Sequence, residues 1–176
     1  MRSTRQIGFI AACGLASGAA AWVVFASLPA TRVLVGTRAI DAVVPVHYQV
    51  TVFPAFGAYC AALAMDVARR ERARVIGRAL LVAAVVALAV VRLAGQVGLS
   101  GHAVCCAAVA VESLASRQRS EWVLVVLLAM AGLAVTGWYK LWIWGDPVWF
   151  VVSVATGAAI GLACGPQALV SVRKPR

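Results

Sequence analysis

The sequence predicts an all-α membrane protein, a bundle of six transmembrane helices formed by one domain over residues 1–176. Composition gives the first indication: 63% of the residues are hydrophobic, only 12% are charged and the mean hydropathy is +0.92. About a quarter of the residues of a soluble domain are charged, so this class is excluded. The second indication is a recurrence of apolar runs of about 20 residues, the length with which a helix crosses the hydrocarbon core.

Six segments of the chain have this length or approach it. We place them at residues 7–29, 48–67, 77–97, 101–115, 122–142 and 147–169. The first begins after Arg2 and Arg5, and its apolar run exceeds the roughly 7 to 15 residues of a secretory signal, so we expect it to be retained as a helix. The fourth is the shortest, and it contains Glu112.

The net charge of +10 comes from basic residues whose distribution along the chain indicates the membrane topology. With six spans, most basic residues fall on the side that holds both termini: Arg2, Arg5, Arg69, Arg70, Arg72, Arg74, Arg78, Arg117, Arg119, Arg173, Lys174 and Arg176. The other side holds Arg32, Arg38, Arg92 and Lys140. Because cytoplasmic loops carry the excess of Lys and Arg, we expect both termini in the cytoplasm. The expected location is a bacterial inner (plasma) membrane, with membrane lipids and no nucleic acid as partners.

Two groups of residues are expected near the membrane surfaces. Four tryptophans surround the end of the fifth segment and the start of the sixth, as in an aromatic belt: Trp138, Trp142, Trp144 and Trp149. Asp66 and Glu112 are expected toward the cytoplasmic side, paired with the arginines there. The basic stretch 69–78 is in addition placed to contact anionic lipid.

Polar residues also gather on the side opposite the termini, at helix ends and in connections. They are His47, Arg92, Ser100, His102, Lys140 and Asp146, and they include both histidines of the chain. Polar side chains are costly beside lipid, so such a group indicates a single outward-facing site.

The stretch Ser100-Gly101-His102 opens the fourth segment with chemistry that suits an anion. A helix start supplies free backbone N–H groups and the positive end of the helix dipole, and a glycine lets an anion approach the backbone closely. Arg92 and Lys140 would hold phosphoryl oxygens. His102 would donate or accept a proton. In the structural alternative Ser100 caps the helix, His102 bonds a neighbour, and the two cations extend to the interface.

These residues resemble the type 2 phosphatidic acid phosphatase superfamily, six-helix enzymes that remove phosphate from lipid or polyprenyl phosphates. Arg92 resembles its first motif, Leu99-Ser100-Gly101-His102 its second, and Tyr139-Lys140 followed by Asp146 its third. The resemblance extends over about residues 77–161. It implies a lipid-phosphate or polyprenyl-phosphate phosphatase or phosphotransferase with an extracytoplasmic site, in which Arg92, Ser100, Gly101 and Lys140 bind the substrate.

The chain departs from that family at the nucleophile. Leu99 replaces a Pro, Tyr139-Lys140 replaces Ser-Arg, and Asp146 stands where the family has its phosphate-attacking His. An Asp forms an acyl phosphate in other enzymes, so Asp146 is a candidate catalytic residue together with His102. Asp146-Pro147 is equally the usual pair that opens a helix. His47 would replace the missing nucleophile if the first long connection folds over the site.

A second resemblance is to rhomboid intramembrane proteases. Gly98-Leu99-Ser100-Gly101 is similar to their serine motif, and Gly157 and Gly161 match a Gly-x-x-x-Gly in their last helix. The rhomboid base, a His three residues before the first of these glycines, is replaced by Val154. A serine without its base is not activated, so this resemblance implies a rhomboid-like protein without proteolysis. The glycines then serve close helix packing.

Two classes of function therefore remain open. The first is a membrane hydrolase that acts on a lipid phosphate or polyprenyl phosphate. The second is a catalytically degenerate relative that binds lipid or stabilises a partner membrane protein. No cofactor and no metal is expected, because two histidines and one carboxylate at these spacings form no recognisable ligand set.

We predict opposite locations for reporter domains fused at position 176 and inserted within residues 31–46. The fusion at position 176 should be active only with a cytoplasmic reporter, and the insertion only with an extracytoplasmic one, because basic residues favour the side of the termini. An extracytoplasmic C-terminus would contradict the topology and separate the polar site from the outer face.

Overall fold

The computed structural model describes residues 2–27, 33–35, 38–40, 44–93, 98–116 and 121–165. Its elements are α1 (Arg2–Ser27), β1 (Val33–Val35), β2 (Arg38–Ile40), α2 (Val46–Val50), α3 (Phe53–Ala68), α4 (Arg72–Leu93), α5 (Gly101–Ala115), α6 (Glu121–Trp138), η1 (Tyr139–Ile143) and α7 (Pro147–Cys164). Within these residues, five helical segments are long and apolar enough to cross a membrane, and α5 is a shorter apolar helix. The prediction of a helical protein with several apolar spans is confirmed at this level.

Several helix bounds differ from the predicted segments. α1 begins at Arg2 instead of residue 7, and α4 begins at Arg72 instead of residue 77. Arginine is a good helix former whose long side chain extends from a buried backbone to the headgroups, so a helix continues past its apolar run. α5 spans Gly101–Ala115, as predicted. Residues 28–29, 94–97 and 166–169 of the predicted segments lie outside the described residues.

The predicted second segment is broken in the structure, and the predicted first connection contains an unexpected hairpin. Residues 46–68 form α2 and α3, separated by a turn at Thr51-Val52. Pro54 is the second residue of α3, and a proline has no N–H with which to continue the hydrogen bonds of a preceding helix. The strands β1 and β2 pair antiparallel, with Val33 opposite Ile40 and Val35 opposite Arg38. β-branched residues favour such pairing, but three-residue strands give no periodic signal in a sequence.

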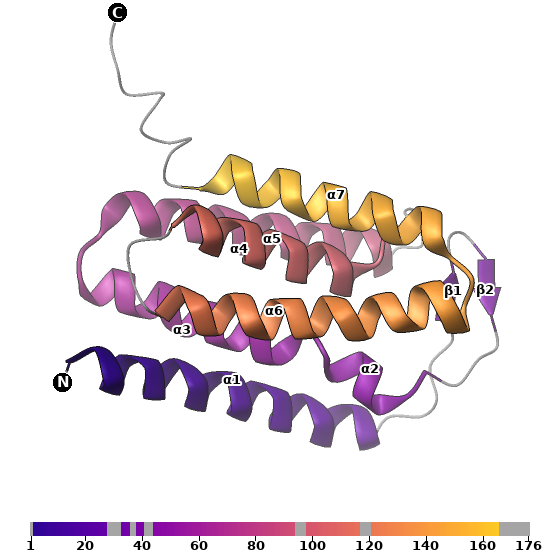
Figure 1. The fold of residues 1–176 in the computed structure, drawn as a ribbon, viewed down its shortest axis with the longest axis horizontal. Coiled ribbons are helices and arrows are strands. Elements are labelled where there is room, and N and C mark those ends of the chain that lie inside the picture. The colour runs from indigo at the N-terminus through magenta and orange to yellow at the C-terminus, as the bar shows by residue number, and fades with distance from the viewer. Residues whose placement is uncertain are drawn as a thin grey trace, which may run out of the picture.

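The helices run side by side along the long axis of the molecule, with α5 in the middle (Figure 1). α5 packs most extensively against α7 and α6, and it also contacts α4 and α3, whereas α1 packs mainly on α3. All residues from Ala103 to Ala110 are buried. A helix that is buried on every face is enclosed by other helices, so α5 is the core of the bundle.

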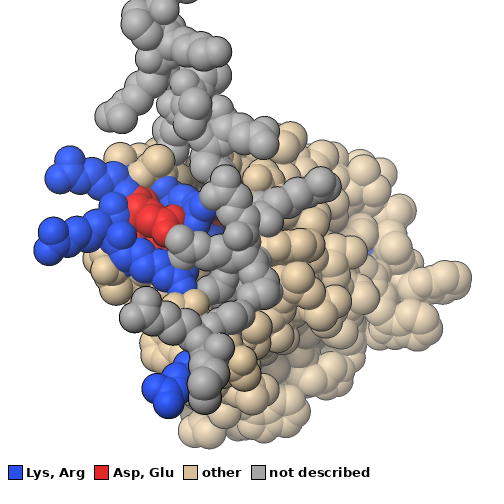
Figure 2. All heavy atoms as spheres, turned by 60° about the vertical axis from the view of Figure 1, so that its left-hand side comes forward, with Lys and Arg blue, Asp and Glu red and all other residues tan. Residues whose placement is uncertain are grey.

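The two ends of the bundle differ in composition. The start of α1, the α3–α4 turn and the end of α7 lie at one end, which we name the basic end after Arg5, Arg69–Arg74 and Arg78 (Figure 1). Figure 2 shows Lys and Arg side chains gathered there around acidic ones. The start of α5, η1 and the α6–α7 connection lie at the other end, which we name the Ser100 end (Figure 1).

Glycines bring α7 into backbone contact with α5. A Cβ atom at Gly157 would lie 2.3 Å from the carbonyl oxygen of Val104, and one at Gly161 would lie 2.5 Å from that of Ala108. Both distances are far below a van der Waals contact, so only glycine fits at either position. The predicted role of Gly157 and Gly161 in close helix packing is confirmed.

At the basic end, the two buried acidic residues share one arginine. Nη1 of Arg78 lies 2.9 Å from Oδ2 of Asp66, and its Nε lies 3.7 Å from Oε1 of Glu112. The hydroxyl of Ser116 donates a hydrogen bond of 2.7 Å to the same Glu112 oxygen. The guanidinium also lies over the ring of Tyr59. The predicted pairing of Asp66 and Glu112 with an arginine is confirmed.

We predict that Gly157→Ala destabilises the bundle by roughly 1–3 kcal/mol, because the added methyl group forces α7 away from α5. The matched control is Gly8→Ala in α1, where an added Cβ meets nothing within 4 Å. That change should be neutral or stabilising by up to about 1 kcal/mol, because alanine favours a helix over glycine. Thermal unfolding in detergent measures both. Equal stability of the two variants would contradict the backbone contact.

Candidate functional site

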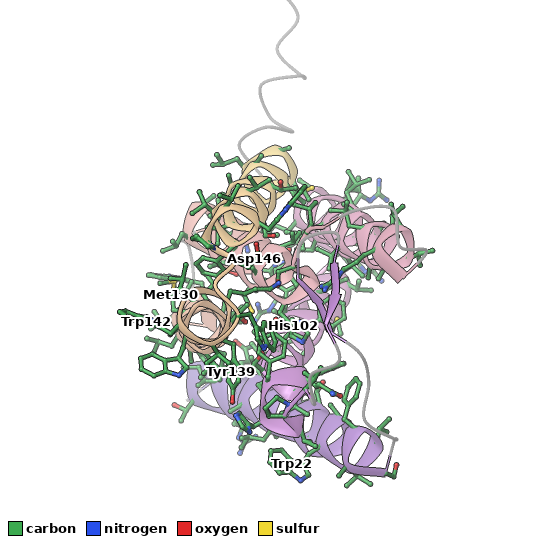
Figure 3. All side chains as sticks on the ribbon, turned by 90° about the vertical axis from the view of Figure 1, so that its right-hand side faces the viewer. Trp22, His102, Met130, Tyr139, Trp142 and Asp146 are labelled. Atoms are coloured by element: carbon green, nitrogen blue, oxygen red, sulfur yellow. The ribbon has the colours of Figure 1, made fainter. Side chains whose placement is uncertain are left out.

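The residues predicted to form the outward site come together at the Ser100 end. They belong to four parts of the chain: α2, the end of α4, the start of α5, and η1 with the connection to α7. In Figure 3, which looks at this end, His102 lies between the helices, whereas Trp22, Met130 and Trp142 point away from the bundle. Helix packing therefore assembles residues that are far apart in the sequence.

His102 is partly buried and connects α5 to α2. Its Nε2 donates a hydrogen bond of 3.0 Å to the carbonyl oxygen of Gln49. Since a carbonyl can only accept, this nitrogen carries the proton in a neutral ring. The imidazole also packs on the ring of Tyr48, with 4.8 Å between the centroids. His102 thus holds α2 against the start of α5, as the structural alternative predicts.

Ser100 caps α5 and is fully buried. Its Oγ accepts a hydrogen bond of 3.4 Å from the backbone N–H of Ala103, and its own N–H donates to Oγ of Ser153 on α7 at 2.7 Å. The hydroxyl of Ser153 donates in turn to the carbonyl oxygen of Trp149. Ser153 precedes Val154, the position of the rhomboid base. Ser100 is thus the N-cap of α5 and is bonded to α7 through its N–H, and among the described residues no histidine is hydrogen-bonded to its hydroxyl.

Lys140 and Asp146 form a buried ion pair. Nζ of Lys140 lies 3.1 Å from Oδ2 of Asp146, and the two residues are 1% and 7% exposed. The π-helical turn η1 widens the backbone here, and a backbone hydrogen bond of 2.7 Å runs from N of Asp146 to O of Lys140. Asp146 occupies the N-cap position of α7, but its side chain makes no capping hydrogen bond. The prediction that Asp146-Pro147 opens a helix is confirmed, but the Asp146 carboxylate pairs with Lys140 and does not accept a hydrogen bond from the first turn of α7.

His47 joins an aromatic cluster at the same end. Its Nε2 is hydrogen-bonded to the hydroxyl of Tyr139. The ring of Tyr48 lies between those of Tyr139 and Trp144, with centroid distances of 5.2 and 4.7 Å. Nζ of Lys140 lies 5.4 Å from the centroid of the Trp144 ring, within the range of a cation–π interaction. These contacts place His47 at the margin of the site, near Lys140.

Among the side chains that the structure describes, no carboxylate forms an ion pair with Arg92. Asp66 and Glu112 pair with Arg78, Glu71 pairs with Arg74, and Asp146 pairs with Lys140. Nη1 of Arg92 lies 3.7 Å from the position that a Cβ of Gly101 would take. The guanidinium also lies close enough to His102 and Lys140 to interact with them electrostatically.

The first turn of α5 presents two backbone donors beside this cation. The N–H groups of Ser100 and Ala103 are bonded to serine hydroxyls, whereas those of Gly101 and His102 have no acceptor among the described residues. Arg92 lines a small cavity of about 10 Å³ together with Leu99, Gly101 and Val104. This volume holds about one water molecule, so an anion at Gly101 must bind at the mouth of the cavity and not inside it.

Sequence reasoning missed several residues of the site. Gln49 and Tyr48 contribute because α2 turns onto α5, and Ser153 contributes because Gly157 brings α7 close. Trp144 was expected in an aromatic belt, but it is half-buried in the cluster, whereas Trp138 and Trp142 are exposed. Ser153 lies one helical turn before Gly157, and this spacing could have indicated from the sequence that Ser153 faces α5.

No metal centre is formed by the described residues, since they contain no group of three or more His, Cys, Asp or Glu side chains that could hold an ion. No family model, no curated protein and no solved structure matches the chain. The site is therefore interpreted from its own geometry.

We predict that Lys140→Met and Asp146→Asn each destabilise the protein by roughly 3–5 kcal/mol, because each substitution leaves the other member of the ion pair buried without its partner charge. The double variant Lys140→Met/Asp146→Leu should regain most of this loss, since it removes both charges. Arg72→Met, at an exposed position of the basic end, is the control. Thermal unfolding of the purified proteins measures these differences. If Asp146→Asn unfolds like the wild type, the carboxylate acts only as a helix cap, which asparagine replaces.

Proposed function

We propose that this protein is a polytopic membrane protein that binds a phosphate-bearing lipid, such as a diacylglycerol phosphate or polyprenyl phosphate, at an extracytoplasmic site. In this proposal α5 is the sixth span, the basic end faces the cytoplasm, and the Ser100 end faces outward. The positive-inside distribution of arginines supports this orientation.

The observation that carries the proposal is the position of Arg92 beside Gly101. A partly buried guanidinium, which pairs with no carboxylate among the described side chains, adjoins two backbone N–H groups at the start of α5. Guanidinium groups and helix starts are the two commonest ways in which proteins bind phosphate. Lys140 adds positive potential, although Asp146 neutralises most of it.

The apolar surroundings of Arg92 suit a lipid better than a soluble phosphate. The cavity next to the guanidinium is lined on the α4 side by Val85, Leu88 and Ala89. These residues precede Arg92 on the same helix, so they lie deeper in the bilayer when Arg92 is at the interface. A lipid whose phosphate meets Arg92 would lay its chain along them.

The proposal is binding without phosphoryl transfer. A nucleophile needs a free lone pair that faces the phosphorus atom. The carboxylate of Asp146 is held by Lys140, Nε2 of His102 is hydrogen-bonded to Gln49, and Nε2 of His47 is bonded to Tyr139. Because the family nucleophile is absent and these three side chains already make contacts within the protein, the proposal assigns the retained cations to recognition.

A second candidate is a rhomboid-like protein that binds a transmembrane helix of a partner without cleaving it. The observation in its favour is the packing of α7 on α5 through Gly157 and Gly161, which brings Ser153 onto Ser100. Rhomboid proteases would need a histidine one residue beyond Ser153, where Val154 stands. This arrangement preserves helix packing but lacks a base.

We predict that the purified protein binds a diacylglycerol phosphate in detergent micelles in a saturable manner and binds the matched phosphatidylcholine much more weakly. Arg92→Gln should weaken binding by roughly 10- to 100-fold, because a hydrogen bond to a charged group contributes about 1.5–3 kcal/mol. Gly101→Leu should weaken it as well, because the side chain would cover the free N–H groups. Arg72→Gln at the basic end is the control and should bind normally.

A parallel assay of phosphate release tests the absence of turnover. We expect no release from a diacylglycerol phosphate or polyprenyl phosphate by the wild type. Release that is lost in His102→Ala would contradict binding without transfer and establish a phosphatase. Failure of the wild type to bind either lipid would instead favour the partner-helix candidate.

A further inference from the structure

A second feature of the molecule lies at the opposite end, where a groove runs between the start of α1 and the end of α3. The groove has a volume of about 280 Å³ and is lined by Arg5, Gln6, Phe9, Met65, Ala68 and Arg69. Neither helix provides a residue of the Ser100 site there, so the groove is separate from the site described above.

The residues that line the groove differ with their distance from the end of the bundle: the arginines lie at the end, and apolar side chains lie about one helical turn deeper. Arg5 precedes Phe9 by four residues on α1, and Arg69 follows Met65 by four residues at the end of α3. Residues four apart lie on one face of a helix, about one turn of 5.4 Å from each other. On both walls, therefore, an arginine stands at the end of the bundle and an apolar side chain lies one turn deeper.

This division matches the structure of a phospholipid. The phosphate lies at the membrane surface and the acyl chains begin within about one helical turn below it. Phe9 is 50% exposed, so the apolar floor of the groove is accessible to a chain. Basic pockets between transmembrane helices are known to hold anionic headgroups.

The charge of the surroundings favours an anionic headgroup over a zwitterionic one. Arg70, Arg72 and Arg74 lie in the adjoining turn and at the start of α4, and the gathering of Lys and Arg at this end is visible in Figure 2. Asp66 and Glu71, the neighbouring acidic residues, are paired with Arg78 and Arg74. The groove itself is lined by two arginines and no carboxylate.

We propose that the groove between α1 and α3 is a binding site for one anionic phospholipid of the leaflet at the basic end, with Arg5 and Arg69 on its phosphate and Phe9, Met65 and Ala68 against its acyl chains. The bound lipid joins α1 to α3 at the end of the bundle. The proposal does not depend on lipid-phosphate recognition at the Ser100 end.

The test is native mass spectrometry of the protein released from bilayers of phosphatidylcholine and phosphatidylglycerol in a 3:1 ratio, roughly that of a weakly anionic membrane. The wild type should retain phosphatidylglycerol in preference to phosphatidylcholine. The double variant Arg5→Gln/Arg69→Gln should lower this preference by about fivefold or more, since each arginine near an anionic headgroup contributes about that factor. Ala68→Trp, which fills the groove and keeps both arginines, should lower it too.

Two controls separate this site from diffuse charge and from the Ser100 end. Arg72→Gln removes a charge from the basic end outside the groove and should retain phosphatidylglycerol as the wild type does. In an Arg92→Gln background, the double variant Arg5→Gln/Arg69→Gln should still lower the preference by the same factor, because the groove is separate from the Ser100 end. Equal retention by the double variant and the wild type would overturn the proposal. An equal loss in Arg72→Gln would overturn it as well, because attraction would then come from the whole basic end.

Discussion

The close approach of α7 to α5 is the contact on which the rest of the structure depends. α5 is buried from Ala103 to Ala110, and the glycines at 157 and 161 let the backbone of α7 touch its carbonyl oxygens. In lipid, helices gain little from hiding apolar surface from one another, so association relies on close packing and hydrogen bonds between helices. Here the small residues along the interface allow the close packing, and the serines at its end form the hydrogen bond between the helices.

Each end of α5 carries polar groups, and several of them contact neighbouring elements. At the Ser100 end, hydrogen bonds to Ser153 and Gln49 attach α5 to α7 and to α2. At the basic end, Glu112 shares Arg78 with Asp66 and so connects α5 to α4 and α3. Unsatisfied polar groups are costly away from water. The polar residues of α5 therefore fix the positions of the helices around it, and a serine–glycine–histidine stretch has a structural role independent of any ligand.

This structural role changes the interpretation of the motif residues. Lys140, Asp146, Ser100 and His102 all have partners within the protein, so among the described residues our proposal relies on Arg92 and the backbone of Gly101 to bind a ligand. A cation beside two amide donors suits an anion. The two proposed sites, Arg92 with Gly101 and the groove of Arg5 and Arg69, would use the same chemistry at opposite ends of the bundle, and separate substitutions test each.

The sequence by itself determined the helical membrane fold, the bounds of α5, the glycine contact and the separation of basic residues from the polar site. Each of these follows from local composition or spacing, because the lipid environment restricts where charge and small residues occur. Only the tertiary structure decided which residues the polar side chains of the Ser100 end contact. Whether Asp146 caps α7 or binds Lys140 depends on the π-helical turn at Tyr139–Ile143, and whether His102 is free depends on the break before Pro54, which turns α2 onto α5. The contact of His102 with Gln49 joins residues 53 positions apart, and that of Lys140 with Asp146 joins residues six positions apart across the end of the π-helical turn. Neither follows from a local hydrophobic pattern, because both depend on how the helices pack.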